Sequence, residues 1–441
     1  MIENVQRSFK NSPSLKVLII LVIALLLLIP RFNIESLVEE RKGLQDEVIS
    51  QIHDQWASEQ TFSGPIFTVP YQELLNKGTK NEAIETRYVY LLPENLKIDG
   101  EIIPEERKIN IYKAIVYNSE LSFKGDFDLI QIEELQIDSA KIQWDKACVN
   151  FGITDPRGIT SISNLNYGEE QAAIKPGLSN RQMKFPNGLH ASIKGLQADQ
   201  SFPFSGQISL KGSTGLYFTP FAKNTEVNIQ SPWKDPGFKG AFLPTERKIT
   251  DEGFTSTWKI LEYNRSLQHV WDNYIETGAK WRMGVDLIDQ VNIYQKVTRS
   301  VKYATLIIAL TFTFFFFFEI LKKLKIHPIQ YTIVGFALLI FYVLLLALSE
   351  HMSFGVSFLV SAIGIVSITT YYFYFISKST TVTTAFGFMF SSIYFFIYVI
   401  LNIESHSLLI GSLGLFVLIA LIMHFTRKID WYNLNRKAIS T

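Results

Sequence analysis

Six stretches of this 441-residue chain are apolar and close to the length that crosses a lipid bilayer as a helix. Inside hydrocarbon a backbone must satisfy its own hydrogen bonds, and an α-helix does so within each stretch. The stretches run from about Leu15 to Ile29, Val301 to Phe318, Ile329 to Leu348, Phe354 to Ile376, Thr384 to Ile403 and Leu408 to Phe425. The sequence therefore predicts a multi-pass membrane protein.

The first stretch is the shortest, and it resembles a secretory signal because Arg7, Lys10 and Lys16 accompany its apolar run. It is followed by Pro30 to Ile34, a segment without the small residues of a cleavage site. We therefore interpret residues 1–30 as a cytoplasmic tip and an uncleaved transmembrane anchor.

The positive charges of the short loops set the predicted orientation, because cytoplasmic loops are enriched in lysine and arginine. The loops Ser349–Ser353 and Asn402–Ser407 contain neither residue type. Basic residues occur in the alternate loops and after the last stretch, at Lys322, Lys323, Lys325, Lys378, Arg427, Lys428, Arg436 and Lys437. We therefore expect cytoplasmic termini, five helices over 301–426, a cytoplasmic tail over 427–441 and a large extracytoplasmic segment before residue 301.

That segment begins with a helical pattern and continues with strands. Residues 31–62 are predicted to form an amphipathic stalk helix that packs on another part of the chain. The apolar residues at helical spacing in it are Leu37, Leu44, Val48, Ile52 and Trp56. Residues 63–300 carry short β-branched and aromatic runs between turn residues, which is typical of a β-sandwich. The predicted fold class is thus a membrane α + β protein: an N-terminal anchor helix, a large all-β extracytoplasmic domain and a C-terminal five-helix transmembrane bundle.

Two alternatives remain for the β domain, which is either one sandwich or two packed halves. The segment Ile103–Ile109 recurs in similar form at Leu243–Ile249, each at the start of a strand-like run. The recurrence indicates either an internal duplication or a chance repeat of a turn followed by charges, since a single repeat has no regular period.

Composition and motifs argue against several classes of function. The net charge of +1 does not fit a protein that neutralises many phosphates, so no nucleic-acid partner is predicted. The single cysteine, Cys148, cannot form an intrachain disulfide or a thiolate metal cage. The sequence contains no P-loop, H-E-x-x-H helix, G-x-S-x-G elbow or C-x-x-C pair. We therefore predict no catalytic, cofactor or metal residues, and a protein that is not an enzyme.

Three charged pairs are candidate functional residues, namely Glu350, His351, Glu106, Arg107, Asp155 and Arg157. The first pair lies where the third apolar stretch reaches the outer surface. It either links a proton or ligand to the bundle or forms a solvated helix end without a function of its own. The other two pairs form either a ligand-facing charged cluster or ion pairs at turns. Glu319, at the end of the second stretch, is predicted to pair with Lys322 or Lys323.

The order of several motifs is similar to that of a known family. The motifs are Gly64-Pro65, Leu92-Pro93-Glu94, Glu106-Arg107-Lys108 before Ile111-Tyr112, Gly125-Asp126-Phe127, Asp155-Pro156-Arg157-Gly158-Ile159, Tyr303 to Glu319, His327 to Tyr331, Phe341 to His351 and Thr426 to Tyr432. On these residues the chain resembles the CreD family of inner-membrane cell-envelope-integrity proteins of Gram-negative bacteria. Asn110 stands where a glycine is expected, and asparagine tolerates the same left-handed backbone.

The resemblance implies an inner-membrane location and a role in envelope integrity or stress tolerance, but it implies no reaction. We expect a non-enzymatic protein whose periplasmic β domain binds a periplasmic protein, a membrane protein or a cell-wall partner, besides the lipid bilayer. One alternative is a transporter or flippase-like bundle, which an intramembrane glutamate or an unwound span would favour. The other is an envelope hydrolase, which a cleft with two carboxylates or a Ser-His pair would favour.

Overall fold

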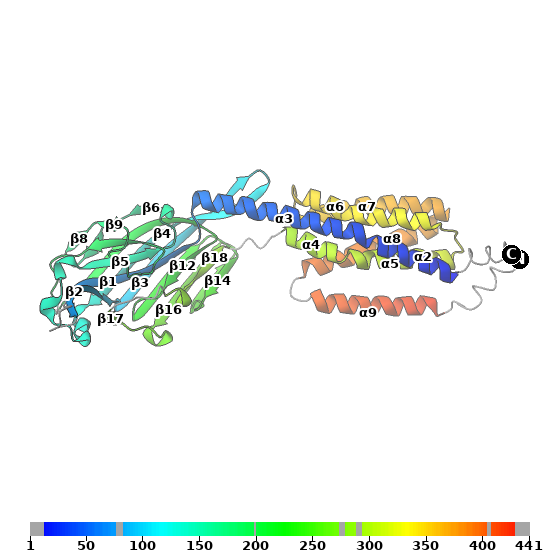
Figure 1. Cartoon of the computed structure of the whole chain (residues 1–441). Coiled ribbons are helices and arrows are strands. Elements are labelled where there is room, and N and C mark those ends of the chain that lie inside the picture. The colour runs from blue at the N-terminus through cyan, green and yellow to red at the C-terminus, as the bar shows by residue number, and fades with distance from the viewer. Residues whose placement is uncertain are drawn as a thin grey trace. The chain divides into compact units, whose positions relative to one another are not determined.

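A computed structural model describes residues 13–75, 83–197, 200–272, 278–287, 293–403 and 407–427 (Figure 1). These residues divide into two compact units. The described residues within 1–46 and 291–441 form a helical unit, and those within 47–290 form a unit built mainly of strands. Most of the predicted cytoplasmic tail, 427–441, lies outside the described residues.

The chain enters the structure as two successive helices, α2 (Pro13–Leu26) and α3 (Leu28–Trp56). The break at Leu27 comes three residues before Pro30, which has no N–H to donate to the preceding turn. Leu27 itself is buried, and it lies against Gly335, where a side chain would collide with it. The stalk helix therefore starts inside the predicted anchor and ends at Trp56, earlier than the predicted boundary at residue 62.

Among the described residues, the C-terminal part contains a helix for each of the last five apolar stretches, preceded by a short helix over Ile293–Lys302 that they do not predict. In chain order the helices are α4 (Ile293–Lys302), α5 (Ala304–Leu321), α6 (Pro328–Ser349), α7 (Phe354–Ser377), α8 (Thr380–Asn402) and α9 (Ser407–Thr426). By length and hydropathy, α5, α6, α7 and α8 can each cross a membrane, as can the helical segment Leu15–Trp56. Pro328 starts α6 at the position where its missing N–H costs nothing. These helices confirm the membrane α + β fold class.

Aromatic side chains fill the interior of the helical unit. Phe315 lies 5.2 Å from Phe373 and 5.0 Å from Phe386 between ring centroids, both in edge-to-face geometry. Phe312 and Phe315 are buried, so the phenylalanine run of α5 faces the core at every third to fourth position. On α7, Ser357 and Ser361 are buried at the spacing that lets helices approach closely.

The strand unit consists of two sheets (Figure 1). Across the first sheet the order is β14 (Pro236–Gly240), β18 (Met283–Leu287), β12 (Gly215–Thr219), β1 (Gln60–Leu75), β5 (Cys148–Ile153), β10 (Asn187–Ser192) and β9 (Ile174–Pro176), with β2 (Ala83–Leu91) on β1 and β17 (Val270–Asp272) on β2. Across the second it is β15 (Glu246–Thr250), β16 (Gly253–Leu261), β13 (Asn224–Ser231), β3 (Asn95–Ile109), β4 (Tyr112–Asp128), β11 (Ser201–Ser213), β7 (Leu165–Tyr167) and β8 (Glu170–Ala172), with β6 (Ile159–Ile162) also on β11. Short 3₁₀ helices connect the strands: η1 (Leu129–Leu135), η2 (Ser139–Lys141), η3 (Trp144–Lys146), η4 (Pro156–Gly158), η5 (Glu262–Asn264) and η6 (Ala279–Trp281).

One hydrophobic core lies between the two sheets. Phe62 and Phe151 of the first sheet lie 5.6 Å and 5.2 Å from Phe123 of the second between ring centroids. The same cluster extends to Trp258 in β16. Of the two alternatives for the β domain, the structure has the single sandwich, with strands of both sheets packed face to face.

The recurring segments occupy different positions in the second sheet. Ile103–Ile109 belongs to β3, which pairs along its length with β4 and also pairs with β13. Leu243–Ile249 leads into β15, a fully exposed edge strand that pairs with β16. Both segments precede a hairpin turn. Their surroundings differ otherwise, because β3 has a strand on each side and β15 is an edge strand.

The last turns of α3 pack on the β3–β4 hairpin. Ile52 is buried together with Ala114 and Val116 of β4, and Val48 and Trp56 are packed against the same cluster. This contact covers the C-terminal part of the apolar stripe that the helical spacing predicts. It ties the start of the strand unit to its second sheet.

Candidate functional site

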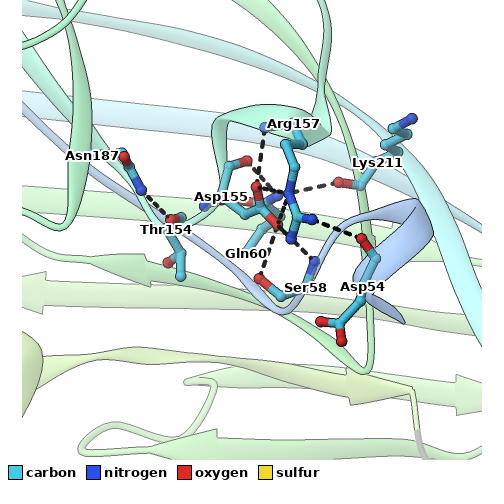
Figure 2. Close-up of polar contacts among 8 residues, drawn as sticks. All are labelled: Asp54, Ser58, Gln60, Thr154, Asp155, Arg157, Asn187 and Lys211. Carbon is cyan, nitrogen blue, oxygen red and sulfur yellow. Dashed lines mark hydrogen bonds and ion pairs between the residues drawn. The ribbon is translucent and has the colours of Figure 1, made fainter. Parts of the chain in front are cut away.

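Asp155 is a buried carboxylate in the turn between β5 and η4 (Figure 2). The order Asp-Pro-Arg-Gly favours this turn, because the aspartate caps the 3₁₀ helix and proline fixes its first residue. Oδ2 accepts hydrogen bonds from Ser58 N at 3.1 Å and from Ser58 Oγ at 3.2 Å. Oδ1 accepts from Arg157 N at 3.1 Å. The carboxylate therefore joins the segment after α3 to the turn after β5.

Arg157 extends this connection to α3 itself. Its Nε and Nη2 donate to the two oxygens of Asp155 at 3.0 Å and 2.7 Å, a two-pronged ion pair. Its Nη1 donates to the backbone oxygen of Asp54 at 2.7 Å (Figure 2). The last carbonyls of a helix lack partners within the helix and carry partial negative charge. Arg157 therefore caps the C-terminus of α3.

Gln60, which is fully buried at the start of β1, completes the arrangement. Its Nε2 donates to the backbone oxygen of Asp155 at 2.9 Å and to that of Lys211 at 3.3 Å, and its Oε1 accepts from Asp155 N at 3.3 Å. The side chain thus joins β1, the η4 turn and β11. We refer to Ser58, Gln60, Asp155 and Arg157 as the latch.

Gly158 packs so closely against the latch that a larger residue does not fit there. A substitution at this position tests how tightly the latch is packed. A Cβ at this position would lie 2.2 Å from Gln60 Nε2 and 2.4 Å from the backbone oxygen of Lys211. Because one neighbour is backbone, we expect Gly158→Ala to lower the free energy of unfolding by about 1–3 kcal/mol, measured by denaturant titration of the purified chain. Gly43→Ala is the control, because a Cβ at Gly43 would meet no other part of the described structure within 4 Å and alanine favours helix. Equal behaviour of the two variants would contradict the tight fit.

Arg107 meets the same turn of α3 from β3. Its guanidinium lies 4.5 Å from the ring centroid of Trp56, and Lys211 Nζ lies 5.0 Å from it. Trp56 Nε1 donates to the backbone oxygen of Tyr117 at 3.4 Å. Glu106 instead points to an exposed ion pair with Lys113 at 3.0 Å. The structure thus places Arg107, Asp155 and Arg157 around the end of α3 and leaves Glu106 on the surface.

The electrostatics of the latch favour a permanent ion pair. Hydrogen bonds from Arg157 hold the pKa of Asp155 well below its usual range, against the opposing effect of burial. A carboxylate that stays ionised and accepts this many hydrogen bonds does not donate protons near neutral pH. The latch is therefore suited to holding the last turn of α3 against the sandwich, and less to acid–base chemistry.

Glu350 and His351 belong to the helical unit. Glu350 follows α6, and its Oε1 accepts a hydrogen bond from Tyr294 Oη of α4 at 3.1 Å. His351 is exposed, and its backbone N–H closes the last turn on Leu348 at 3.0 Å. Glu350 thus connects α6 to α4, and His351 lies at the end of α6.

A partly buried ion pair in the helical unit was not predicted from the sequence. Glu319, predicted to pair with Lys322 or Lys323, instead pairs with Lys16 of α2. Lys16 Nζ also donates to the backbone oxygen of Ile326 at 2.7 Å, and Tyr331 Oη donates to Glu319 Oε2 at 3.0 Å. Lysine inside an apolar stretch was the signal in the sequence, because a buried charge needs a partner.

The outer face of the second sheet carries a depression of about 480 Å³. Five neighbouring strands contribute alternate side chains to it, while the residues between them point into the core. Register aligns its polar residues in two rows, and these are Gln207, Ser122, Asp99, Asn228 and Thr257, then Ser209, Glu120, Glu101, Gln230 and Thr255. Asn228 Nδ2 donates to Asp99 Oδ1 at 2.8 Å, and Thr257 Oγ1 donates to Asn228 Oδ1 at 2.8 Å. We call this surface the polar depression.

Comparison with solved structures gives weak likenesses. An M1 zinc metallopeptidase from Deinococcus radiodurans is 8% identical, with 44% of this chain and 41% of that chain covered and a TM-score of 0.21. Yeast LTA4 hydrolase in complex with Bestatin is 10% identical, with 36% and 25% covered and a TM-score of 0.18. In both cases the matched part spans less than half of this chain and less than half of the other.

Comparison of sequences is decisive. The family described as Inner membrane protein CreD matches residues 12–432 of this chain. Inner membrane protein CreD of Escherichia coli (strain K12) is 32% identical over 416 residues, which cover 92% of this chain and 91% of that protein. The chain therefore belongs to the CreD family of multi-pass inner membrane proteins.

Proposed function

We propose that this protein is non-enzymatic and contributes to cell-envelope integrity or stress tolerance by binding an envelope component through the polar depression of its β domain. The polar depression is the main observation behind this proposal. Its polar side chains point away from the core and line a hollow across five strands. The partner is a periplasmic protein, a membrane protein or the cell wall. The helical unit anchors the protein in the inner membrane.

The chemistry of the depression supports binding of a polar surface. Amide, hydroxyl and carboxylate groups alternate along its two rows, so donors and acceptors of hydrogen bonds are available side by side. Glu101 and Glu120 are direct cross-strand neighbours, and like charges in that position destabilise a sheet. A partner that brings a hydrogen-bond donor or a positive charge between them relieves this repulsion.

In-cell photo-crosslinking tests this role. A photoreactive residue at Gln207 or at Gln230, both exposed in the depression, is expected to capture the same envelope protein or peptidoglycan fragment. The control position is Thr86, which is exposed on β2 of the first sheet. Ser122→Trp fills the depression and should abolish capture, whereas Thr86→Trp should not.

Two outcomes would count against the proposal. Capture of the same species from Thr86, or capture that survives Ser122→Trp, would show that binding does not take place in the polar depression. Capture of lipid or a small metabolite alone would favour a transporter. Glu319 gives the transporter little support, because it lies in the last turn of α5 and is paired with Lys16.

We also propose that the β domain is periplasmic and both termini cytoplasmic, which the distribution of basic residues supports. In a Cys148→Ser background, Ser353→Cys, between α6 and α7, should react with a membrane-impermeant thiol reagent in cells with a permeabilised outer membrane. Ser379→Cys, between α7 and α8, should react only after the inner membrane is opened. The reverse labelling pattern would invert the orientation.

A second candidate function is hydrolysis of an envelope polymer, because the depression brings together the carboxylates of Glu101 and Glu120. Both residues are exposed, whereas the general acid of a glycosidase is typically held in an apolar pocket. Glu101→Gln and Glu120→Gln separate the two functions. A hydrolase would lose turnover of purified peptidoglycan in either variant, whereas a binding protein shows no turnover before or after the change.

A further inference from the structure

A buried guanidinium lies in the β domain, apart from the latch and the polar depression. Arg265 directly follows η5 and is 7% exposed. Its Nη2 donates to the backbone oxygen of Ala222. Its Nε and Nη1 are buried and have no hydrogen-bond partner among the residues that the structure describes. Buried polar groups are almost always hydrogen-bonded, so these donors require an acceptor.

The charge of Arg265 is also uncompensated. Burial lowers its pKa to about 10, against the weaker opposing effect of Glu262. Within the described residues, no carboxylate lies within ion-pair distance of the guanidinium. A buried cation without a counter-charge is costly, which is why buried arginines are normally paired.

His269 lies at the other end of the same short loop and adds two further unused groups. Its side chain is 12% exposed, and neither ring nitrogen forms a hydrogen bond with the described residues. Nε2 lies 3.2 Å from Glu94 Oε1 without the direction of a hydrogen bond. Burial and the neighbouring Lys223 lower its pKa to about 4, so the ring is neutral near pH 7.

Glu94, the carboxylate beside His269, is already occupied. Lys223 Nζ donates to its Oε1 at 2.8 Å, and Gln131 Nε2 donates to the same oxygen. This ion pair neutralises Glu94, so the positive charge of Arg265 remains. The cluster thus presents one unpaired cation and a neutral imidazole that can donate from either nitrogen.

We propose that Arg265 and His269 form an enclosed binding site for an oxyanion, the carboxylate or phosphate group of a ligand. An oxyanion supplies both the missing counter-charge and acceptors for the free N–H groups, and hydrogen bonds between charged groups are the strong ones. Because these donors are covered in the structure, the anion enters when the loop Arg265–His269 moves. The site does not depend on the polar depression or on the identity of its partner.

Thermal unfolding of the full-length chain in nanodiscs tests the site, with inorganic phosphate and acetate as probes. Each anion replaces chloride at constant ionic strength, so that general salt effects stay fixed. We expect a saturable rise of the unfolding midpoint with at least one probe, because a ligand of the folded state stabilises it by mass action. Phosphate alone would identify a phosphate-type ligand, and acetate alone a carboxylate-type ligand.

Arg265→Gln should weaken the apparent affinity for the effective anion at least tenfold. Arg247→Gln, the same change at an exposed arginine of β15, should leave it unchanged. Arg265→Met covers the case in which the glutamine variant unfolds. It removes the buried charge, so its midpoint should exceed that of the wild type without the anion and fall below it at saturation. Absence of a saturable effect in the wild type, or an equal effect in Arg265→Gln, would show that Arg265 binds neither anion and would overturn the proposal.

Discussion

Replacing Glu319 with glutamine is expected to lower the free energy of unfolding of the helical unit by about 3–5 kcal/mol. The change leaves Lys16 without a counter-charge where it is largely surrounded by protein, since its side chain is 27% exposed. Tyr331 loses a charged acceptor at the same time. Unfolding of the purified chain in mixed micelles of increasing denaturing detergent measures the effect.

Glu40→Gln is the matched control, because Glu40 is exposed on α3 of the same unit, and we expect it to change the free energy by less than about 0.5 kcal/mol. The double variant Lys16→Met with Glu319→Met removes both charges and should recover most of the loss, since apolar replacement of a buried pair is often neutral. A double variant as unstable as Glu319→Gln would show that the ion pair is not the source of the effect.

Asp155→Asn is expected to lower the free energy of unfolding of the β domain by about 2–3 kcal/mol, because charged hydrogen bonds to Arg157 and Ser58 are lost. The amide also turns one acceptor into a donor facing other donors. Denaturant unfolding followed by tryptophan fluorescence measures the change, since Trp258 and Trp271 are buried in this domain. Asp145→Asn, at an exposed position, serves as the control.

The latch also predicts a dependence on pH. The pKa of Asp155 in the folded state lies below its unfolded value of about 3.9. Its contribution to stability is therefore complete above that unfolded value and is lost as the pH falls through the acid range toward the folded pKa. Asp155→Asn has no carboxylate at this position, so its stability should fall less steeply than that of the wild type over the same acid range. An identical acid slope for wild type and Asp155→Asn would mean that other carboxylates account for it.

The membrane helices were predictable because hydropathy is a local property of the sequence. The bounds of α6 and α7 differ from the apolar stretches by one residue at most at each end. The extension of the second stretch was not predictable, since Ile293–Lys302 is helical in the structure but carries Lys296, Arg299 and Lys302. An amphipathic helix next to a span has a low mean hydropathy, because the average includes its polar face as well as its apolar face. Mean hydropathy therefore does not detect it.

Charged pairs were harder to predict, because their partners are distant in the sequence. Glu319 has lysines three and four residues away, yet it pairs with Lys16, 303 residues away. The pair Asp155 and Arg157 was visible as a charged turn, but Ser58, 97 residues from Asp155, was not. Local spacing identifies which residues can meet on one helix or turn, and tertiary packing decides which of them do.

The polar depression and the Arg265 cluster depend on strand register and on loop positions. Alternation along β3 and β4 shows that residues such as Asp99 and Glu120 point away from the core. It does not show that five strands align these residues into a hollow. Arg265 looks like any arginine after a turn, and only its burial and its unused donors distinguish it.

The pairing of β1 with β12 has a consequence for how the protein is made. These strands are parallel neighbours, and Ser63 Oγ contacts Thr219 Oγ1 at 2.9 Å across 156 residues of chain. At translation rates of about 5–20 residues per second, roughly 10–30 seconds separate the synthesis of the two strands. During that interval residues 60–63 of β1, which include the core residue Phe62, have no parallel partner and are open to misfolding. The first sheet of the β domain can therefore be completed only after the last third of the domain has been synthesised.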